Sequence, residues 1–322
     1  MEPVTPTLPD NDVAAIDRLG AIYKELSSEL SKMIIGQQRV VELLSIALFS
    51  RGHALLMGVP GLAKTLLVSS VAKTLDLSFN RIQFTPDLMP ADITGTDIIQ
   101  DDSAGGKRQF EFIRGPVFAN IVLADEINRA PAKTQSALLE VMQEGRLTVD
   151  GKTYAVPQPF IVMATQNPFG SSGTQELPES QTDRFMIRIT VGYPAREDEI
   201  HILSGESRNP AETLTPVISP AQLLALREEA GRIHVEDSLY GYMVDLARAT
   251  RNHPDIRLGV SPRGTMCLAA MTKAHALMEG RTYATPDDVM AVAPYTLSHR
   301  ISLTGDARYA GKTAESVLSS IL

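Results

Sequence analysis

The sequence predicts an α/β fold, in which a parallel sheet is flanked by helices, followed by an all-α lid. Apolar runs at Ala54–Met57 and Ile121–Ala124 have the length and composition of buried parallel strands. Beyond residue 200, apolar residues recur instead with the period of helices. We therefore expect a loose arm over residues 1–11, an α/β domain over 12–200 and a helical lid domain over 201–322.

The residues after the first apolar run predict a phosphate-binding loop. They follow the pattern GxxxxGK[ST] except at Ala63, where the pattern expects glycine. Such a loop directs backbone N–H groups at phosphate oxygens, and the following helix adds its positive N-terminal end. The residues expected to contact the phosphates are Gly58, Val59, Pro60, Gly61, Leu62, Ala63, Lys64, Thr65 and Leu66.

Ala63 is the one departure from the pattern. We interpret it as the point where the helix begins, with a helical φ that tolerates a methyl group, while Gly58 and Gly61 allow the tight turn. A Gly/Pro turn that binds nothing is the alternative interpretation of these residues taken alone. The rest of the chain has to decide between the two.

The second apolar run ends in two carboxylates, Asp125 and Glu126. In an open α/β sheet, ligands bind beyond the carboxyl ends of the strands, so both acids are expected to face the loop. Lys64 would reach the β- and γ-phosphates, and Thr65 and Asp125 would hold Mg²⁺, in part through water. Glu126 would orient the attacking water. Loop and acids together predict a site for ATP and Mg²⁺.

A third apolar run, Pro159–Thr165, predicts another strand, followed by Gln166, Asn167 and Pro168. Asn167 at its end is suited to bond the attacking water or the γ-phosphate. An asparagine before proline also forms turns for purely structural reasons. Asn167 is therefore a candidate that depends on its context.

With these elements in this order, the chain resembles the AAA+ ATPases and, more narrowly, the MoxR family. The segment with Ile35 and Gly36 resembles the one that packs on adenine in this superfamily. The stretches that look like MoxR signatures are residues 84–90, 115–120 and 125–140. The resemblance extends over about residues 28–305.

The resemblance implies roles for three further residues. It makes Asn167 the sensor-1 residue, Arg184 an arginine finger that reaches a neighbouring subunit's nucleotide, and Arg263 a sensor-2 residue that contacts the nucleotide from the first turn of a lid helix. An arginine finger accelerates hydrolysis by ~10³–10⁵ where this has been measured. Taken singly, either arginine would more often be a solvated surface residue.

Two hairpins interrupt the α/β alternation. The first is expected from Asp97–Ile99 to Phe110–Phe112 with its tip at 101–106, and the second at Arg146–Val156 around Asp150-Gly151. In position they resemble the helix-2 insert and pre-sensor-1 hairpin of the clade that contains MoxR and magnesium chelatase. The first is a candidate client contact because its polar, glycine-rich tip is expected to be exposed; surface decoration is the alternative.

Composition excludes several classes of protein. The formal net charge is −8, which argues against a general nucleic-acid binder. The single cysteine, Cys267, cannot form an intramolecular disulfide and suits a reducing compartment. Apolar runs long enough for a membrane span are absent from the sequence, and the histidines lack metal-ligand spacing. We expect a cytoplasmic protein with no metal other than Mg²⁺.

The resemblance implies that ATP hydrolysis drives chaperone-like remodelling, assembly or metal-loading of partner proteins. It also implies a homo-oligomeric ring, a hexamer, and clients with von Willebrand factor A domains. A magnesium-chelatase-like motor subunit is one alternative. A DNA-acting AAA+ motor is another, although it would need a basic DNA-facing surface. A nucleotide-binding scaffold without hydrolysis is the third.

Overall fold

A parallel sheet lies at the centre of the molecule. The computed structural model describes residues 10–101, 108–149, 151–167, 177–204 and 214–322. Within these ranges the strand order of the sheet is β2-β5-β8-β1-β9, and every neighbouring pair is parallel. The strands are β1 (Ala54–Met57), β2 (Phe79–Gln83), β5 (Ile121–Asp125), β8 (Ile161–Gln166) and β9 (Ile187–Thr190). All three predicted strands are confirmed.

Alternate residues of each strand face opposite sides of the sheet, which divides the core into two clusters. Leu56 and Leu123 belong to the cluster shared with α2 (Gln38–Phe49), α3 (Lys64–Thr74) and helices of the carboxyl-terminal region. Leu55 and Val122 belong to the cluster shared with α5 (Ala132–Glu144). Because both faces are covered, β1, β5 and β8 are apolar up to their carboxyl-terminal residues, as buried parallel strands require.

Five further helical elements of the described chain belong to this part of the fold. They are α1 (Asp10–Ser31), α4 (Pro90–Thr94), η1 (Ile127–Arg129), α6 (Glu179–Thr182) and α7 (Arg196–Ser204). None of the helices within the described ranges has the length and apolar character that crossing a membrane would require.

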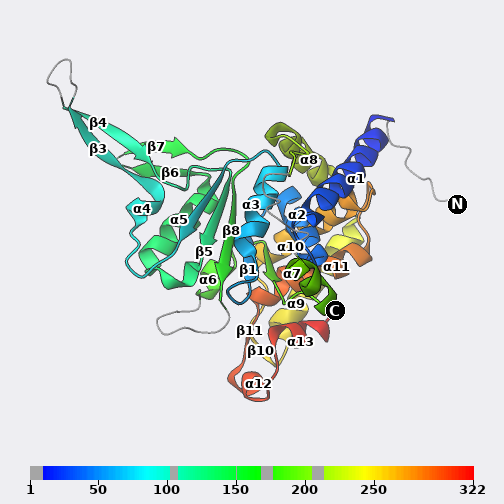
Figure 1. The fold of residues 1–322 in the computed structure, drawn as a ribbon. Coiled ribbons are helices and arrows are strands. Elements are labelled where there is room, and N and C mark those ends of the chain that lie inside the picture. Colours follow the sequence, from blue (N-terminus) through cyan, green and yellow to red (C-terminus); the bar gives the residue numbers. More distant parts are fainter. Residues whose placement is uncertain (1–9, 102–107, 150, 168–176, 205–213) are drawn as a thin grey trace, which may run out of the picture.

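Both predicted hairpins are present. The first consists of β3 (Gly95–Asp101) and β4 (Arg108–Arg114) and projects from the body of the molecule (Figure 1). The second consists of β6 (Arg146–Val149) and β7 (Lys152–Ala155). Phe112 stacks on Tyr154 with ring centroids 4.2 Å apart, so the two hairpins support each other. Most of the predicted first tip, 102–106, and Asp150 lie outside the described residues.

The carboxyl-terminal region is helical, as predicted. Its elements are α8 (Pro220–Arg232), α9 (Asp237–Asn252), α10 (Pro262–Met278), α11 (Pro286–Leu297), η3 (Ser298–Arg300), α12 (Gly305–Tyr309) and α13 (Ala314–Ser319). A small antiparallel pair, β10 (Ile256–Leu258) with β11 (Ser302–Leu303), is an addition to the expected all-α region. The domain boundary near residue 200 stays a prediction.

The starts of three of these helices follow from their sequences. Each begins with proline, whose fixed φ suits the first helical turn and whose missing N–H would have no partner there. Ser219 and Ser261 cap α8 and α10 by accepting hydrogen bonds from the backbone N–H groups of Gln222 and Gly264. These caps fix where α10, and with it Arg263, begins.

Candidate nucleotide-binding site

A pocket of about 380 Å³ lies at the carboxyl ends of β1, β5 and β8. Parallel strands end at the same edge of a sheet, so residues far apart in sequence meet there. From the predicted set, the pocket is lined by Gly58, Pro60, Gly61, Leu62, Ala63, Lys64, Thr65, Asp125, Glu126 and Asn167. The expectation that the loop and the two acids face each other is therefore confirmed as geometry.

The loop is held against two neighbouring strands. The backbone N–H of Gly58 donates to the carbonyl of Gln166 on β8, over 3.3 Å. A Cβ at Gly58 would lie 2.8 Å from the carbonyl oxygen of Val191, just after β9, so a larger residue would push the loop off the sheet. Gly61 has φ +89, a backbone conformation that favours glycine. Both glycines are required by the turn, as predicted.

Ala63 does not have the helical φ that we expected. Its φ of 51 and ψ of 25 lie in the left-handed region, and it precedes the first residue of α3. The helix does begin beside Ala63, but the helical φ that we expected for this residue is wrong. Glycine would adopt this conformation without strain, whereas alanine carries a cost of about 1 kcal/mol or more. The methyl group is tolerated because the loop fixes the conformation, and not because the conformation is helical.

The N-terminus of α3 fits a phosphate group. The N-cap residue, Ala63, makes no side-chain hydrogen bond to this helix, and the first N–H groups of any helix lack partners inside it. The helix is 11 residues long and starts at Lys64, at the edge of the pocket. Free N–H groups, the positive end of the helix and the lysine ammonium together provide the donors that phosphate oxygens need.

Lys64 is bound to its own loop in this structure. Its ammonium donates to the carbonyls of Gly58 and Val59, each over 2.7 Å. Burial lowers the pKa of Lys64, and the nearby carboxylates of Asp125 and Glu126 oppose that shift. A triphosphate in the pocket would offer stronger, charged acceptors than these two carbonyls. Lys64 would then turn from the loop to the phosphates.

Asp125 is positioned by residues from the two strands beside it. One carboxylate oxygen accepts a 2.5 Å hydrogen bond from the hydroxyl of Thr165 on β8. The other accepts from Nη2 and Nε of Arg81 on β2, over 2.6 and 3.0 Å. The side chains of Thr65 and Asp125 thus face one pocket with oxygen atoms, the ligand type that Mg²⁺ prefers. A metal at this position would compete with Arg81 for Asp125.

Glu126 has a strained backbone, with φ 55 and ψ 48 in the left-handed region. Its backbone N–H donates to the Thr165 hydroxyl over 2.8 Å. Its carboxylate accepts from the side-chain amide of Gln83 over 3.1 Å and from the guanidinium of Arg129 over 2.7 Å. The left-handed turn aims the Glu126 side chain across the pocket, while Asp125 keeps its place in β5.

Sequence reasoning missed the roles of Arg81, Gln83 and Thr165. Arg81 and Gln83 alternate on β2, so both point to the same face of the strand. Gln83 is paired in register with Asp125, and Thr165 with Leu56 just before the loop. The signal in the sequence was the polar pair Arg81 and Gln83, two residues apart at the end of a short strand. The sequence did not show that this strand lies beside β5.

Other predicted site residues lie outside this pocket. Arg184 donates to the carbonyl of Leu139 on α5 and lines a separate cavity of about 370 Å³. Arg263 is exposed in the first turn of α10.

The remaining predicted residues also lie away from the pocket. Ile35 and Gly36 lie before α2, and Gly36, with φ +72, packs against Asp198 of α7. The carbonyl of Val59 accepts a hydrogen bond from Lys64, and Leu66 is partly exposed on α3. Neither is among the lining residues.

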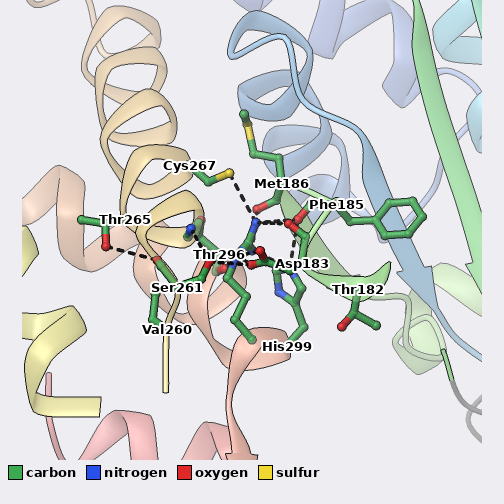
Figure 2. Close-up of polar contacts among 12 residues, drawn as sticks. Thr182, Asp183, Phe185, Met186, Val260, Ser261, Thr265, Cys267, Thr296 and His299 are labelled. Atoms are coloured by element: carbon green, nitrogen blue, oxygen red, sulfur yellow. Dashed lines mark hydrogen bonds and ion pairs between the residues drawn. The ribbon is translucent and has the colours of Figure 1, made fainter. Parts of the chain in front are cut away.

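A buried polar cluster connects the segment of Arg184 with the start of α10 (Figure 2). Asp183 accepts a hydrogen bond from the hydroxyl of Ser261 at both carboxylate oxygens, over 3.0 and 3.1 Å. Nε of Arg300 lies 3.0 Å from the same carboxylate, and Nη2 of Arg300 donates to the carbonyl of Phe185 over 2.7 Å. This cluster connects Asp183, which precedes Arg184, to Ser261, which lies two residues before Arg263.

Comparisons with known proteins agree with this geometry. Residues 53–187 match the model of the ATPase family associated with various cellular activities (AAA), and residues 248–321 match the AAA lid domain. A crystal structure of a candidate ATPase from Cytophaga hutchinsonii superposes with a TM-score of 0.87 at 40% identity, covering 95% of this chain and 94% of that one. The fold and site define an ATPase of the AAA+ class with a carboxyl-terminal lid.

Three relatives narrow the assignment. The uncharacterized protein YeaC of Bacillus subtilis is 44% identical, over 91% of this chain and 91% of its own length. Chaperone MoxR1 of Mycobacterium tuberculosis is 44% identical, over 91% of this chain and 79% of its own. Protein MoxR of Paracoccus denitrificans is 32% identical, over 88% and 89%. The chain belongs to the MoxR family of chaperone-like AAA+ ATPases.

Proposed function

We propose that this ATPase hydrolyses ATP to ADP and phosphate and uses the cycle to remodel a partner protein. One observation carries the proposal: the loop at Gly58–Thr65, the acids Asp125 and Glu126, and Asn167 line one pocket at one edge of the sheet. These are the parts that phosphoryl transfer to water requires, namely phosphate donors, metal ligands and a group to orient water. Membership of the MoxR family supports the remodelling role.

Each residue of the pocket has a distinct task in this proposal. Thr65 and Asp125 would hold Mg²⁺, which neutralises charge on the phosphates when it is bound. Lys64 leaves the loop carbonyls and binds the β- and γ-phosphates. Glu126 orients and polarises the attacking water. Its carboxylate must first release its hydrogen bonds from Arg129 and Gln83 so that it can accept one from the water. Asn167 bonds the water or the γ-phosphate.

Two arginines complete the site from outside the pocket. Arg184 lines a different cavity, with α5 and α6, so its guanidinium reaches a nucleotide only in a neighbouring subunit. Arg263, at the start of α10, contacts the nucleotide of its own subunit and changes the angle of the lid when the γ-phosphate leaves. A finger supplied from a neighbour requires a ring with head-to-tail contacts, and we propose a hexamer.

The client in this proposal carries a von Willebrand factor A domain. The β3–β4 hairpin offers a contact surface, because Ile99 and Phe110 are cross-strand partners and both are largely exposed, at 57% and 69%. Apolar side chains paired on a projecting hairpin are unusual unless a partner covers them. Ile99→Ser with Phe110→Ser should abolish client capture while leaving ATP turnover without client unchanged.

The ATPase mechanism is tested by two substitutions with different outcomes. Lys64→Ala should abolish ATP binding, because the ammonium and its phosphate contacts are lost. Glu126→Gln should retain ATP but stop turnover, because the amide cannot polarise water. Binding is measured with a fluorescent ATP analogue and turnover by phosphate release. Unchanged turnover in Glu126→Gln would refute the proposed role of Glu126.

The ring is tested by mixing defective subunits. Arg184→Ala and Lys64→Ala should each be inactive alone, but their mixture should recover part of the activity. Each mixed interface can combine an intact loop from one subunit with an intact Arg184 from the next. Absence of recovery in mixed rings, whose assembly is verified by mass, would count against a finger acting between subunits. Capture experiments with Glu126→Gln and ATP then test whether the bound client contains the proposed domain.

A further inference from the structure

A third cavity shares no lining residue with the nucleotide pocket or with the cavity beside Arg184. It measures about 500 Å³ and is formed where α8 and α10 pack against the carboxyl-terminal end of α2. Phe49, Tyr240, Met266 and Ala269 give it an apolar wall. Its volume is within the range of small-molecule sites in proteins.

Arg227 of α8 lines this cavity and is buried, with 5% of its surface exposed. Its Nε donates to the carbonyl of Leu48 at the end of α2, over 2.8 Å, whereas its Nη2 has almost no exposed surface and no hydrogen-bond partner among the described residues. Within the described part of the chain, no carboxylate lies at ion-pair distance from Arg227. Burial and the neighbouring Arg51 lower the pKa of Arg227 to about 10, so the guanidinium stays charged near neutral pH.

An unpaired buried charge is costly to fold, so its persistence calls for a partner. The partial negative charge at the end of α2 compensates only part of that cost. The acids nearest in sequence are engaged elsewhere: Glu228 pairs with Arg51 at the surface, and Glu229 with Arg232. The chain itself therefore does not supply an anion for Arg227 within the described residues.

The electrostatics of the cavity are opposite to those of the whole protein. The chain has a formal net charge of −8, yet the lining of this cavity includes Arg51, Arg227 and Lys273 and contains no carboxylate. Lys273 is half-buried and bonds the carbonyl of Gly231 over 3.1 Å, which holds its ammonium at the rim. Cations above an apolar wall suit a ligand with an anionic end and an apolar body.

We propose that this cavity binds an oxyanion, a carboxylate or phosphate, attached to an apolar group. The oxyanion pairs with the guanidinium of Arg227 and with Lys273, and the apolar group packs against Phe49 and Met266. A bound ligand bridges α2, which precedes the phosphate-binding loop, and the carboxyl-terminal helices α8 and α10. The site is independent of ATP hydrolysis and stands whether or not the proposed reaction is correct.

The test measures the affinity of the full chain for phenyl phosphate, phenylacetate and inorganic phosphate by calorimetry. We expect at least one phenyl probe to bind more tightly than inorganic phosphate, and the tighter of the two identifies the oxyanion. Arg227→Met should weaken binding tenfold or more, because a charge-assisted hydrogen bond is lost. Equal affinity in the wild type and Arg227→Met, or no binding of either phenyl probe, would overturn the proposal.

Matched variants separate binding in this cavity from binding at other cationic groups of the protein. Arg232→Met removes an exposed arginine of the same helix and should leave affinity unchanged. Lys64→Ala should also leave it unchanged, which distinguishes this cavity from the phosphate-binding loop; loss of binding there would contradict the assignment. Should Arg227→Met fail to fold, Lys273→Met replaces it: a severalfold weaker affinity supports the site, and an unchanged affinity argues against it.

Discussion

Asp183 and Arg300 form an ion pair between the segment that carries Arg184 and the end of the α11–η3 region, with Nε and Oδ1 3.0 Å apart. The Arg300 side chain is 1% exposed and that of Asp183 is 21% exposed. Ser261, the cap of α10, shares the same carboxylate. Asp183 therefore links the start of α10 to the segment of Arg184.

Asp183→Asn should lower the free energy of unfolding by about 2 kcal/mol, because it leaves the buried Arg300 without its charge partner. The estimate is at the low end for buried pairs, since Asp183 is partly exposed. Asp255→Asn, which breaks a more exposed pair with Lys312, should cost no more than about 1 kcal/mol. Urea unfolding measures the free energy of unfolding of both variants. Equal losses would show that the Asp183–Arg300 pair stabilises the fold no more than an exposed pair does.

Ala63→Gly should leave stability unchanged to within about 0.5 kcal/mol or increase it. Glycine removes the left-handed strain at φ 51, and this gain offsets the greater chain entropy of glycine in the unfolded state. Ala225→Gly, at an exposed position inside α8, should cost about 1 kcal/mol. Thermal unfolding compares the two, and similar losses would mean that Ala63 is not strained in solution.

Thr165→Val should reduce ATP turnover at least about tenfold with nearly the same side-chain volume. It removes the hydroxyl that bonds both the Asp125 carboxylate and the Glu126 N–H, so both acids lose their orientation. Thr272→Val deletes a buried hydroxyl that bonds only Leu268 within α10 and should leave turnover unchanged. Phosphate release assays decide, and equal turnover in the two variants would exclude a positioning role for Thr165.

Acid should destabilise the fold through His53. Its Nδ1 accepts from the N–H of Val162 and its Nε2 lies 3.0 Å from the carbonyl of Met142, so the half-buried ring is neutral. Burial lowers its pKa from 6.5 to about 4. Because the folded pKa is below the unfolded one, stability is complete above pH 6.5 and falls toward pH 4, by about 2 kcal/mol at pH 5.

Urea unfolding at pH 7 and pH 5 checks the His53 prediction. His53→Asn should lower stability at pH 7 but reduce the difference between the two pH values, because the titrating group is gone. His201→Asn, at an exposed position of α7, is the control and should keep the full difference. An unchanged difference in His53→Asn would assign the acid sensitivity to other groups, of which the buried His299, with a strongly lowered pKa, is the first candidate.

The parts of the site that lie within one continuous motif were predictable. The loop pattern itself includes Lys64. Asp125 and Asn167 lie at the ends of apolar runs whose length and composition indicate parallel strands. Arg81, Gln83 and Thr165 were not predictable, because their roles depend on strands that are far apart in sequence and meet only in the sheet order β2-β5-β8-β1. Strand order is set by packing of whole faces, which local patterns do not record.

Local sequence patterns were sufficient to predict the class of fold, the phosphate-binding loop and the two acids, because turns, caps and strand ends depend on residues close together in the sequence. Only the folded chain established that Ala63 and Glu126 have left-handed backbones and that Arg81 forms an ion pair with Asp125. It also established that Arg227 is buried with no carboxylate beside it among the described residues. Backbone strain and burial of charge arise from contacts between distant segments. Those contacts exist only once the sheet and helices have packed.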